Sequence, residues 1–483
     1  MVFSSFLFIF CFLPLCLASY LLTPKRYKNI TLLIWSLLFY AWGTWSFFPV
    51  FIGGCAVDFL IAHLITRSKT ARARHLWVTL SVVLNLGILF YYKYANFFIH
   101  EVNALLSSFG VAPAEWHAVI LPIGISFITF QRISYVIDVY RDTVAPARNF
   151  FDYLLYIAFF PQLIAGPIIR YHDIAQQLIS REHSIENVWQ GLSRFCIGLA
   201  KKVLLADVLG NITANVDKLG PDTITLGYAW LGVICYGFQL YFDFSGYSDM
   251  AIGLGRIFGF KFLENFDRPY TSQTFSEFWR RWHISLSRVM RDYLYIPLGG
   301  NRVGPIRSIR NLWIVFLLSG FWHGANWTFI FFGAYHGLFL TLDKFGWGNY
   351  SKQIATKRFG RTFNIFLTFF FVQIGWVFFK SKSIAAAWTY LGYMFNPRYL
   401  KAEVFTLPSD IIHNAGMFVF ILSVTIFLLQ LCPEYDNFLA KVKSLFRIVP
   451  LPLLRFISCA VTIILCGVVL SATRFTPFIY FQF

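Results

Sequence analysis

Two histidines lie inside an apolar stretch of the sequence, and their side chains are the first candidates for chemistry. Residues 319 to 337 read SGFWHGANWTFIFFGAYHG and contain His323 and His336. If this stretch is one membrane helix, Ser319 precedes His323 by four residues and Asn326 follows it by three, so these polar groups share one face. A neutral imidazole can take a proton from a hydroxyl, and desolvation favours the neutral form. His323 is therefore a candidate general base.

The other histidines are weaker candidates on spacing alone. His336 follows His323 by thirteen residues, which is about 20 Å along a continuous helix and on a different face. The two cannot share a metal ion, and we expect His336 to be structural. His283 shares a helical stripe with Trp279 and Met290, and both a functional role and simple packing stay open for it. The sequence contains no HExxH, P-loop, GxSxG or EF-hand motif, which disfavours metal, nucleotide and serine-hydrolase chemistry.

The composition indicates the kind of molecule that must position these groups. Of the 483 residues, 57% are hydrophobic and only 13% are charged, too few charges for a soluble domain. We predict an all-α polytopic integral membrane protein with about eleven transmembrane helices and additional re-entrant or interfacial helices. The net charge of +18 comes from short clusters between apolar runs, which is typical of cytoplasmic loops and of contacts with lipid headgroups or an anionic donor. Nucleic acid is not an expected partner.

Charged residues inside or beside the apolar runs mark further positions of interest. Lys201 and Lys202 lie in an otherwise apolar segment, where snorkelling to the headgroups is the simplest expectation. Asp243 and Asp249 lie in the stretch that ends a clear span, at positions where a carboxylate must be paired or hydrated. Residues 256–310 contain ten Lys or Arg against four Asp or Glu and cannot form an ordinary lipid-facing span, and we predict an interfacial or re-entrant helix over 275–294. The expected spans lie near residues 3–22, 30–47, 49–65, 76–98, 118–138, 150–168, 224–244, 311–337, 363–380, 411–431 and 455–472.

Two motifs carry a resemblance to a known family. The stretch FWRRWHISLSRVMRDYLYIPLGGNR at 278–302, followed by SGFWHGANWTFIFFGAYHG, resembles the membrane-bound O-acyltransferase family. It is most similar to the bacterial polysaccharide branch, which includes the membrane subunits of alginate and peptidoglycan O-acetylation. The opening MVFSS, the stretch YFDFSGYSDMAIGLG at 241–255 and the ending PFIYFQF resemble the alginate-type subunit. The resemblance implies about eleven helices around a buried tunnel, with His323 of the WHG motif and His283 of the RWH motif as catalytic residues.

The resemblance also implies an activity and a location. We expect a multi-pass protein of the bacterial inner (cytoplasmic) membrane that moves an acetyl group from a cytoplasmic thioester, acetyl-CoA or another acyl thioester, to a hydroxyl for extracytoplasmic polysaccharide O-acetylation. His323 would be the general base, and His283 would hold or polarise the thioester carbonyl. No tightly bound cofactor and no metal is expected, and a periplasmic acetyltransferase is the expected protein partner. A single domain is expected over residues 1–483, with N-terminal helices in 1–168, the catalytic core in 188–340 and C-terminal helices in 360–483.

Several side chains are candidates for binding the substrates. Guanidinium groups pair well with the phosphates of a CoA donor, although headgroup contacts and ion pairs with Glu277 and Asp292 explain them equally well. Two other functions stay open, namely a lipid-modifying acyltransferase of the same family and a transporter that makes no bonds. The candidate binding residues are Asn326, Ser319, Trp322, Arg280, Arg281, Arg288, Arg291, Asp243 and Asp249.

Overall fold

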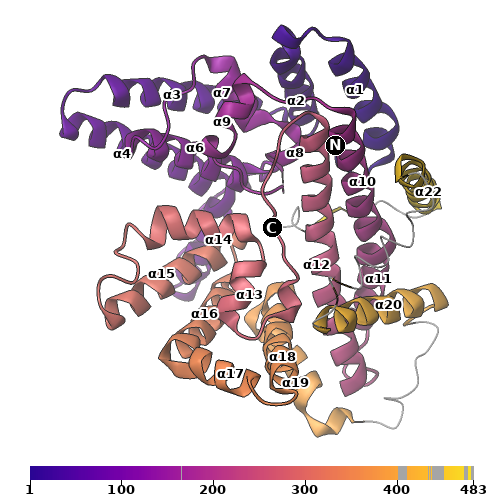
Figure 1. Cartoon of the computed structure of the whole chain (residues 1–483). Coiled ribbons are helices and arrows are strands. Elements are labelled where there is room, and N and C mark those ends of the chain that lie inside the picture. The colour runs from indigo at the N-terminus through magenta and orange to yellow at the C-terminus, as the bar shows by residue number, and fades with distance from the viewer. Residues whose placement is uncertain are drawn as a thin grey trace. The chain divides into compact units, whose positions relative to one another are not determined.

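The computed structural model describes residues 1–164, 166–400, 411–432, 435, 437, 451–472 and 477–479. All regular secondary structure in these ranges is helical (Figure 1), as the composition predicts. The chain divides into two compact units, one made of residues 1–191 and 251–263 and the other of residues 192–250 and 264–483. Two helices, α10 (Ile185–Ala200) and α12 (Leu226–Ile257), run from one unit into the other. The expected single acyltransferase domain stays a prediction.

The first unit is built from the N-terminal helices. The expected interruption of the apolar run at 150–168 is confirmed, because one helix ends at Ala158 and a four-residue helix with Pro161 in its first turn follows. A π-helical turn, Phe90–Tyr94, joins α4 to α5. The helices of this unit are α1 (Leu13–Leu22), α2 (Lys28–Thr44), α3 (Phe48–Arg67), α4 (Ala71–Leu89), α5 (Ala95–Ser108), α6 (Ile125–Tyr140), α7 (Phe150–Ala158), α8 (Phe160–Leu163) and α9 (Tyr171–Ile179).

A buried ion pair ties three helices of the first unit together. Nε of Arg132 on α6 lies 2.6 Å from Oδ2 of Asp58 on α3, and both side chains are almost fully buried. Ser81 and Asn85 on α4 donate to Oδ1 of the same carboxylate at 2.6 and 3.0 Å. A buried charge is tolerated when it is paired and hydrogen-bonded, and these contacts satisfy Asp58 from both neighbouring helices.

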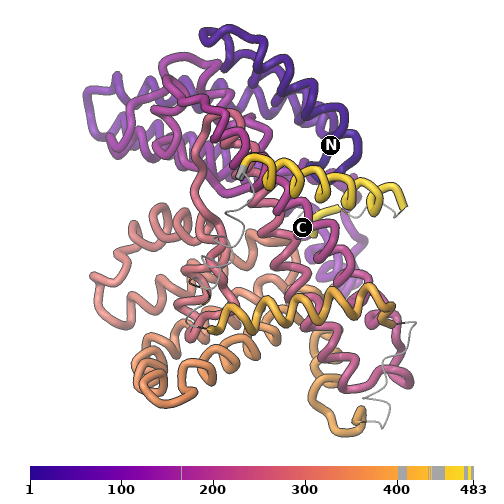
Figure 2. The backbone as a smooth tube through the Cα atoms, turned by 45° about the vertical axis from the view of Figure 1, so that its right-hand side comes forward, coloured from indigo at the N-terminus to yellow at the C-terminus, as the bar shows by residue number. Residues whose placement is uncertain are grey.

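The second unit contains the candidate site residues. In it α20 packs against α11 (Figure 2). The predicted span at 363–380 and the surface helix at 384–396 are confirmed as helices α18 and α19. Besides the ends of α10 and α12, the helices are α11 (Asp207–Asp217), α13 (Phe275–Arg281), α14 (Ile284–Met290), α15 (Pro305–His323), α16 (Trp327–Leu342), α17 (Gly348–Ala355), α18 (Gly360–Lys380), α19 (Ile384–Phe395), α20 (Asn414–Leu431) and α22 (Leu451–Ala472).

Five helices of the described part of the chain are long and apolar enough to cross a membrane. They support a multi-pass membrane protein, whereas the expected total of about eleven spans stays a prediction. They are Phe48–Arg67, Ala71–Ser108, Gly360–Lys380, Asn414–Leu431 and Pro452–Ala472.

The expectation of one continuous helix over 311–337 is wrong. Helix α15 ends at His323, and α16 begins at Trp327 and packs back against α15 (Figure 1). The reversal occurs at Gly324, whose backbone is extended, and Asn326 caps α16 by accepting the backbone N–H of Thr328 at 3.1 Å. His323 therefore lies at the end of a helix, beside a turn.

The expected snorkelling of Lys201 and Lys202 is also wrong, because both lysines form ion pairs inside the second unit. Lys202 lies 2.8 Å from Asp243 on α12, and each side chain is only 2% exposed. Lys201 lies 2.7 Å from Asp249 on the same helix. The second oxygen of Asp243 accepts the backbone N–H of Ile479 at 2.8 Å. Both aspartates are thus paired, as their position in the sequence requires.

Candidate active site

His283 lies in a sharp turn between two short helices. The expected single helix over 275–294 is interrupted, because α13 ends at Arg281 and α14 begins at Ile284. Between them His283 adopts φ 45° and ψ 55°, the left-handed region in which histidine is among the enriched residues. Its side chain is fully buried, and the ring packs edge-on against Phe244 with centroids 4.7 Å apart. A strained backbone that holds one side chain is a feature of functional sites.

Asn265 holds this turn from the segment that follows α12. Its side-chain oxygen lies 3.2 Å from Nδ1 of His283 and accepts two bonds from Ser285, from the backbone N–H at 3.1 Å and from the hydroxyl at 2.9 Å. The backbone carbonyl of Asn265 accepts the N–H of Ile284 at 2.9 Å. Asn265 itself is fully buried. Its sequence position, eighteen residues before His283, carries no motif that predicts this contact.

Trp322 brings the two predicted catalytic histidines into one neighbourhood. The centroid of its indole ring lies 6.1 Å from that of His283 and 5.1 Å from that of His323. His323 is 4% exposed and packs edge-on against Phe332 and Phe379. The aromatic walls exclude water from this neighbourhood and make polar contacts inside it stronger. The structure therefore brings together the RWH and WHG motifs, as the resemblance implies.

His336 lies much closer to this neighbourhood than a continuous helix would place it. Because α16 folds back on α15, the ring of Phe332 contacts both His336, at 4.4 Å between centroids, and His323, at 6.1 Å. The Nδ1 atom of His336 accepts the indole N–H of Trp279 at 3.2 Å. The estimate of about 20 Å along a helix is therefore overturned, and His336 supports the side chain of Trp279.

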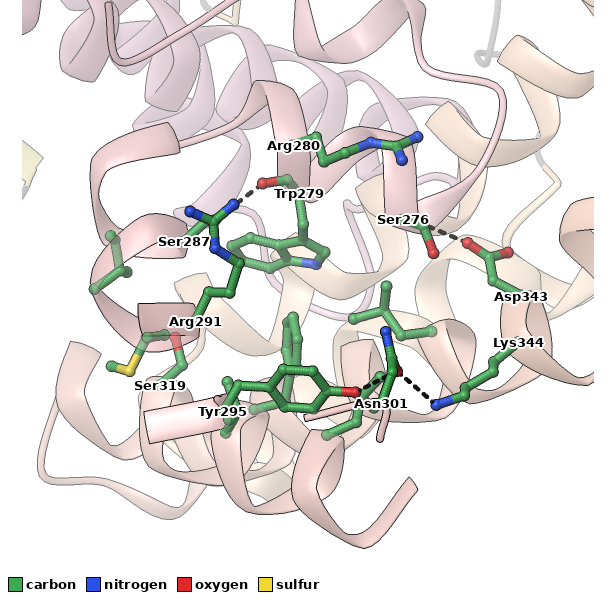
Figure 3. A pocket seen from close by; sticks show the side chains of 16 residues that line it. Ser276, Trp279, Arg280, Ser287, Arg291, Tyr295, Asn301, Ser319, Asp343 and Lys344 are labelled. Atoms are coloured by element: carbon green, nitrogen blue, oxygen red, sulfur yellow. Dashed lines mark hydrogen bonds between the residues drawn. The ribbon is translucent and has the colours of Figure 1, made fainter. Parts of the chain in front are cut away.

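A cavity of about 520 Å³ is lined by several of the predicted binding residues and by Trp279, the partner of His336, whereas none of the three histidines lines it (Figure 3). Arg280 and Arg291 line it, and so does Ser319, one helical turn before His323. The sequence reasoning missed Lys344, which lies across the cavity from Arg291 and Ser319 in Figure 3 and donates to Asn301 at 3.1 Å. The remaining lining residues are Ser276, Trp279, Leu286, Ser287, Met290, Tyr295, Leu312, Val315, Phe316, Leu340 and Asp343.

The other predicted arginines do not line this cavity. Arg281 forms an ion pair with Glu277 at 2.6 Å and donates to Thr271 at 2.9 Å, so a structural role accounts for its charge. Arg288 lies in the last turn of α14, outside the set of residues that line the cavity. Arg291 lines the cavity and also pairs with Asp292 at 2.7 Å.

The remaining candidates have contacts of their own. Asn326 donates from its amide to the carbonyl of Lys382 at 3.0 Å in addition to capping α16. Asp243 and Asp249 lie on α12 in the ion pairs described above, outside the set of residues that line the cavity. No cluster of three or more potential metal ligands occurs among the residues described.

Comparisons with known proteins identify a family and several relatives of this chain. The sequence profile of the MBOAT, membrane-bound O-acyltransferase family matches residues 147–388, which include both histidine motifs. A probable alginate O-acetylase of Pseudomonas syringae pv. tomato is 47% identical over 403 residues, covering 82% of this chain and 75% of the relative. The peptidoglycan O-acetyltransferase of Helicobacter pylori is 38% identical over 426 residues, covering 80% and 78%. A teichoic acid D-alanyltransferase of Streptococcus thermophilus is 30% identical over 285 residues, covering 53% and 68%.

Proposed function

The chain belongs to the membrane-bound O-acyltransferase family, and from that premise we propose that it moves an acetyl group from a cytoplasmic thioester to a hydroxyl acceptor for polysaccharide O-acetylation outside the cytoplasm. The protein is an acyltransferase and a multi-pass membrane protein. Placement in the bacterial inner membrane and acetyl-CoA, or another acyl thioester, as the donor are parts of the proposal. Two relatives whose names denote O-acetyl transfer support the choice of acetyl.

The observation that carries the proposal is a cavity lined by cationic side chains, to whose wall α15, the helix that ends at His323, contributes. Arg280, Arg291 and Lys344 line it, and Ser319 lies on its wall one turn from the histidine. Guanidinium and ammonium groups bind phosphate oxygens well. In the proposed arrangement, the phosphates of a CoA donor bind among these cations and its thioester end lies toward the buried histidines.

The chemistry requires a base in a site from which water is excluded. In the proposed reaction His323 accepts the proton of the acceptor hydroxyl while the oxygen forms a bond to the acetyl carbonyl carbon. The carbon–sulfur bond then breaks, and the proton passes to the departing thiolate, so that a thiol and an acetyl ester are the products. The aromatic walls around His323 protect the thioester from hydrolysis during this step.

The immediate acceptor belongs to the proposal as well. We place a periplasmic acetyltransferase downstream, as a partner that completes delivery to the polymer, and a hydroxyl of that partner or of a carrier is the first acceptor. The role of a membrane lipid as acceptor is the closest rival, because the family includes lipid-modifying enzymes. The two differ in their product.

A His323→Ala variant tests the assignment in cells. We expect acetylation of the extracellular polysaccharide to fall by roughly 10²- to 10⁴-fold, the usual contribution of a general base. The matched control is His100→Ala, which removes a histidine whose side chain is 80% exposed. Full acetylation by His323→Ala at a normal protein level would refute the assignment. A change in membrane lipids on deletion, with unaltered polysaccharide acetylation, would favour the lipid-modifying function.

A further inference from the structure

We propose that Asn265 is a positioning residue for His283 and makes this histidine a hydrogen-bond acceptor toward the substrate. The inference rests on the proposed function and adds a residue to its site. It also changes the role expected for His283 from the sequence, which was to hold or polarise the thioester carbonyl.

The side-chain atom of Asn265 that faces His283 must be the amide oxygen. An asparagine amide has an oxygen and a nitrogen end that contacts must distinguish. Here the same atom lies 3.1 Å from the backbone nitrogen of Ser285, and a backbone N–H can only donate. The atom is therefore an acceptor, and Nδ1 of His283, 3.2 Å away, must carry the hydrogen of that bond.

The position of this hydrogen determines what the other ring nitrogen can do. A neutral imidazole has a single N–H, so a ring that donates from Nδ1 carries a lone pair on Nε2. Such a nitrogen accepts a hydrogen bond or a proton and has nothing to donate to a carbonyl oxygen. Nε2 is shielded from solvent. Under this proposal, a substrate group that reaches Nε2 must be a hydrogen-bond donor, such as a hydroxyl or an amide N–H.

Asn265 is itself held in place, as a positioning residue must be. Its amide nitrogen donates to the hydroxyl of Ser248 on α12 at 3.2 Å. Its backbone carbonyl holds the N–H of Ile284, the first residue of α14. Together with the two bonds from Ser285, these contacts fix the left-handed turn and the ring of His283 as one unit. Fixing the tautomer and orientation of a histidine through its other nitrogen is how such side chains are tuned for function.

The first experiment reads the tautomer without relying on activity. Solid-state NMR of the full chain in lipid nanodiscs, with isotope-labelled histidine, distinguishes a ring protonated at Nδ1 from one protonated at Nε2, and the His283→Gln variant identifies the signal. We expect the Nδ1–H form in the wild type and a mixture of both forms in Asn265→Ala. A wild-type His283 that carries its hydrogen on Nε2 would overturn the proposal.

The second experiment measures turnover of radiolabelled acetyl-CoA by the same preparations. We expect Asn265→Ala to lower kcat about 10- to 100-fold with KM within about twofold, because the cationic cavity is untouched. Asn265→Asp keeps an acceptor for Nδ1–H but adds a negative charge that favours imidazolium. We therefore expect this variant to retain activity, with the acid limb of its pH profile moved to higher pH.

The control is Asn364→Ala, which removes another buried asparagine whose amide donates to a backbone carbonyl at 2.7 Å. It should leave the pH profile unchanged. Wild-type kcat in Asn265→Ala, or an unmoved acid limb in Asn265→Asp, would overturn the positioning role. A wild-type protein that turns over no acetyl-CoA would instead refute the proposed donor, and the tautomer measurement would still decide the role of Asn265.

Discussion

Gly320 of α15 and Gly333 of α16 bring the two helices into backbone contact. A Cβ atom on Gly320 would lie 3.0 Å from the Cα of Gly333 and would collide with the carbonyl oxygen of Phe329. Packed backbone cannot give way as a flexible side chain does. This glycine pair therefore determines how closely α15 and α16 approach each other in the hairpin that carries His323.

Gly320→Ala should therefore impair the reaction by displacing His323. We expect acetyl transfer to fall at least tenfold, since a displacement of about 1 Å near the reacting groups is costly. The matched control is Gly337→Ala on the same hairpin, where an added Cβ meets neighbours at an ordinary 3.6 Å or more. Equal activity of the two variants at equal protein levels would show that the spacing of the hairpin does not control the site.

Reversing charges in the cavity should weaken donor binding. For Arg280→Glu and Arg291→Glu we expect KM for acetyl-CoA to rise by roughly tenfold each, equivalent to ~1.4 kcal/mol, with a smaller change in kcat. The effect should shrink at high salt, because screening weakens charge interactions at an open cavity. Arg307→Glu, an exposed residue in the first turn of α15, is the control. An unchanged KM in both cavity variants would show that the donor phosphates do not bind in this cavity.

Gly54→Ala should destabilise the first unit through its buried ion pair. A Cβ at position 54 would lie 2.5 Å from Nη1 of Arg132, so the buried guanidinium must shift from its present position beside Asp58. Breaking a buried pair costs roughly 3–5 kcal/mol, and we expect a clear loss of thermal stability and of protein in the membrane. Its neighbour Gly53 provides the control, since an added Cβ there meets nothing within 4 Å. Similar melting of both variants would contradict this account.

The stability of the first unit should depend on pH through His172. Its Nδ1 lies 2.7 Å from Asp138 and its Nε2 lies 3.4 Å from Asp173, and hydrogen bonding to these carboxylates raises the pKa of His172 to about 9. The stabilisation is complete below the unfolded pKa of about 6.5 and is lost as pH rises through about 9. The melting midpoints of wild type and His172→Gln should differ most below about pH 6.5 and converge above about pH 9. A difference in melting midpoint that stays constant over this pH range would show that the charge of His172 does not contribute to stability.

Hydropathy correctly predicted helices that coincide with long apolar runs. It missed the helix breaks that single residues, such as Gly324 and His283, introduce. The helix over 360–380 follows from a long apolar run. The reversal at Gly324 lies between two apolar runs, so a hydropathy window averages over both runs and predicts a single helix. The available signal was the asparagine at 326, a good N-cap, followed by the periodic pattern of α16. Similarly, the left-handed turn at His283 divides a stretch whose charge spacing fits one helix.

The candidate site was predictable only where its residues form motifs. His283 and His323 stand in recognisable sequence contexts, and Arg280 and Arg291 belong to a basic cluster. Asn265 and Lys344 reach the site through tertiary contacts that depend on where other helices end. The ion pairs that Lys201 and Lys202 form with α12 were misjudged for the same reason, because Asp249 and Asp243 lie 48 and 41 residues further along the chain.

The hydrogen bond from Ile479 to Asp243 has a consequence for how the protein is made. The two residues are 236 positions apart, and a ribosome adding 5–20 residues per second needs roughly 10–50 s to cover that distance. During this interval Asp243 and Lys202 are already in the growing chain without the last donor. The hydrogen bond that completes this polar cluster therefore forms late in biogenesis. Until then, the cluster of Asp243 and Lys202 lacks the backbone N–H of Ile479.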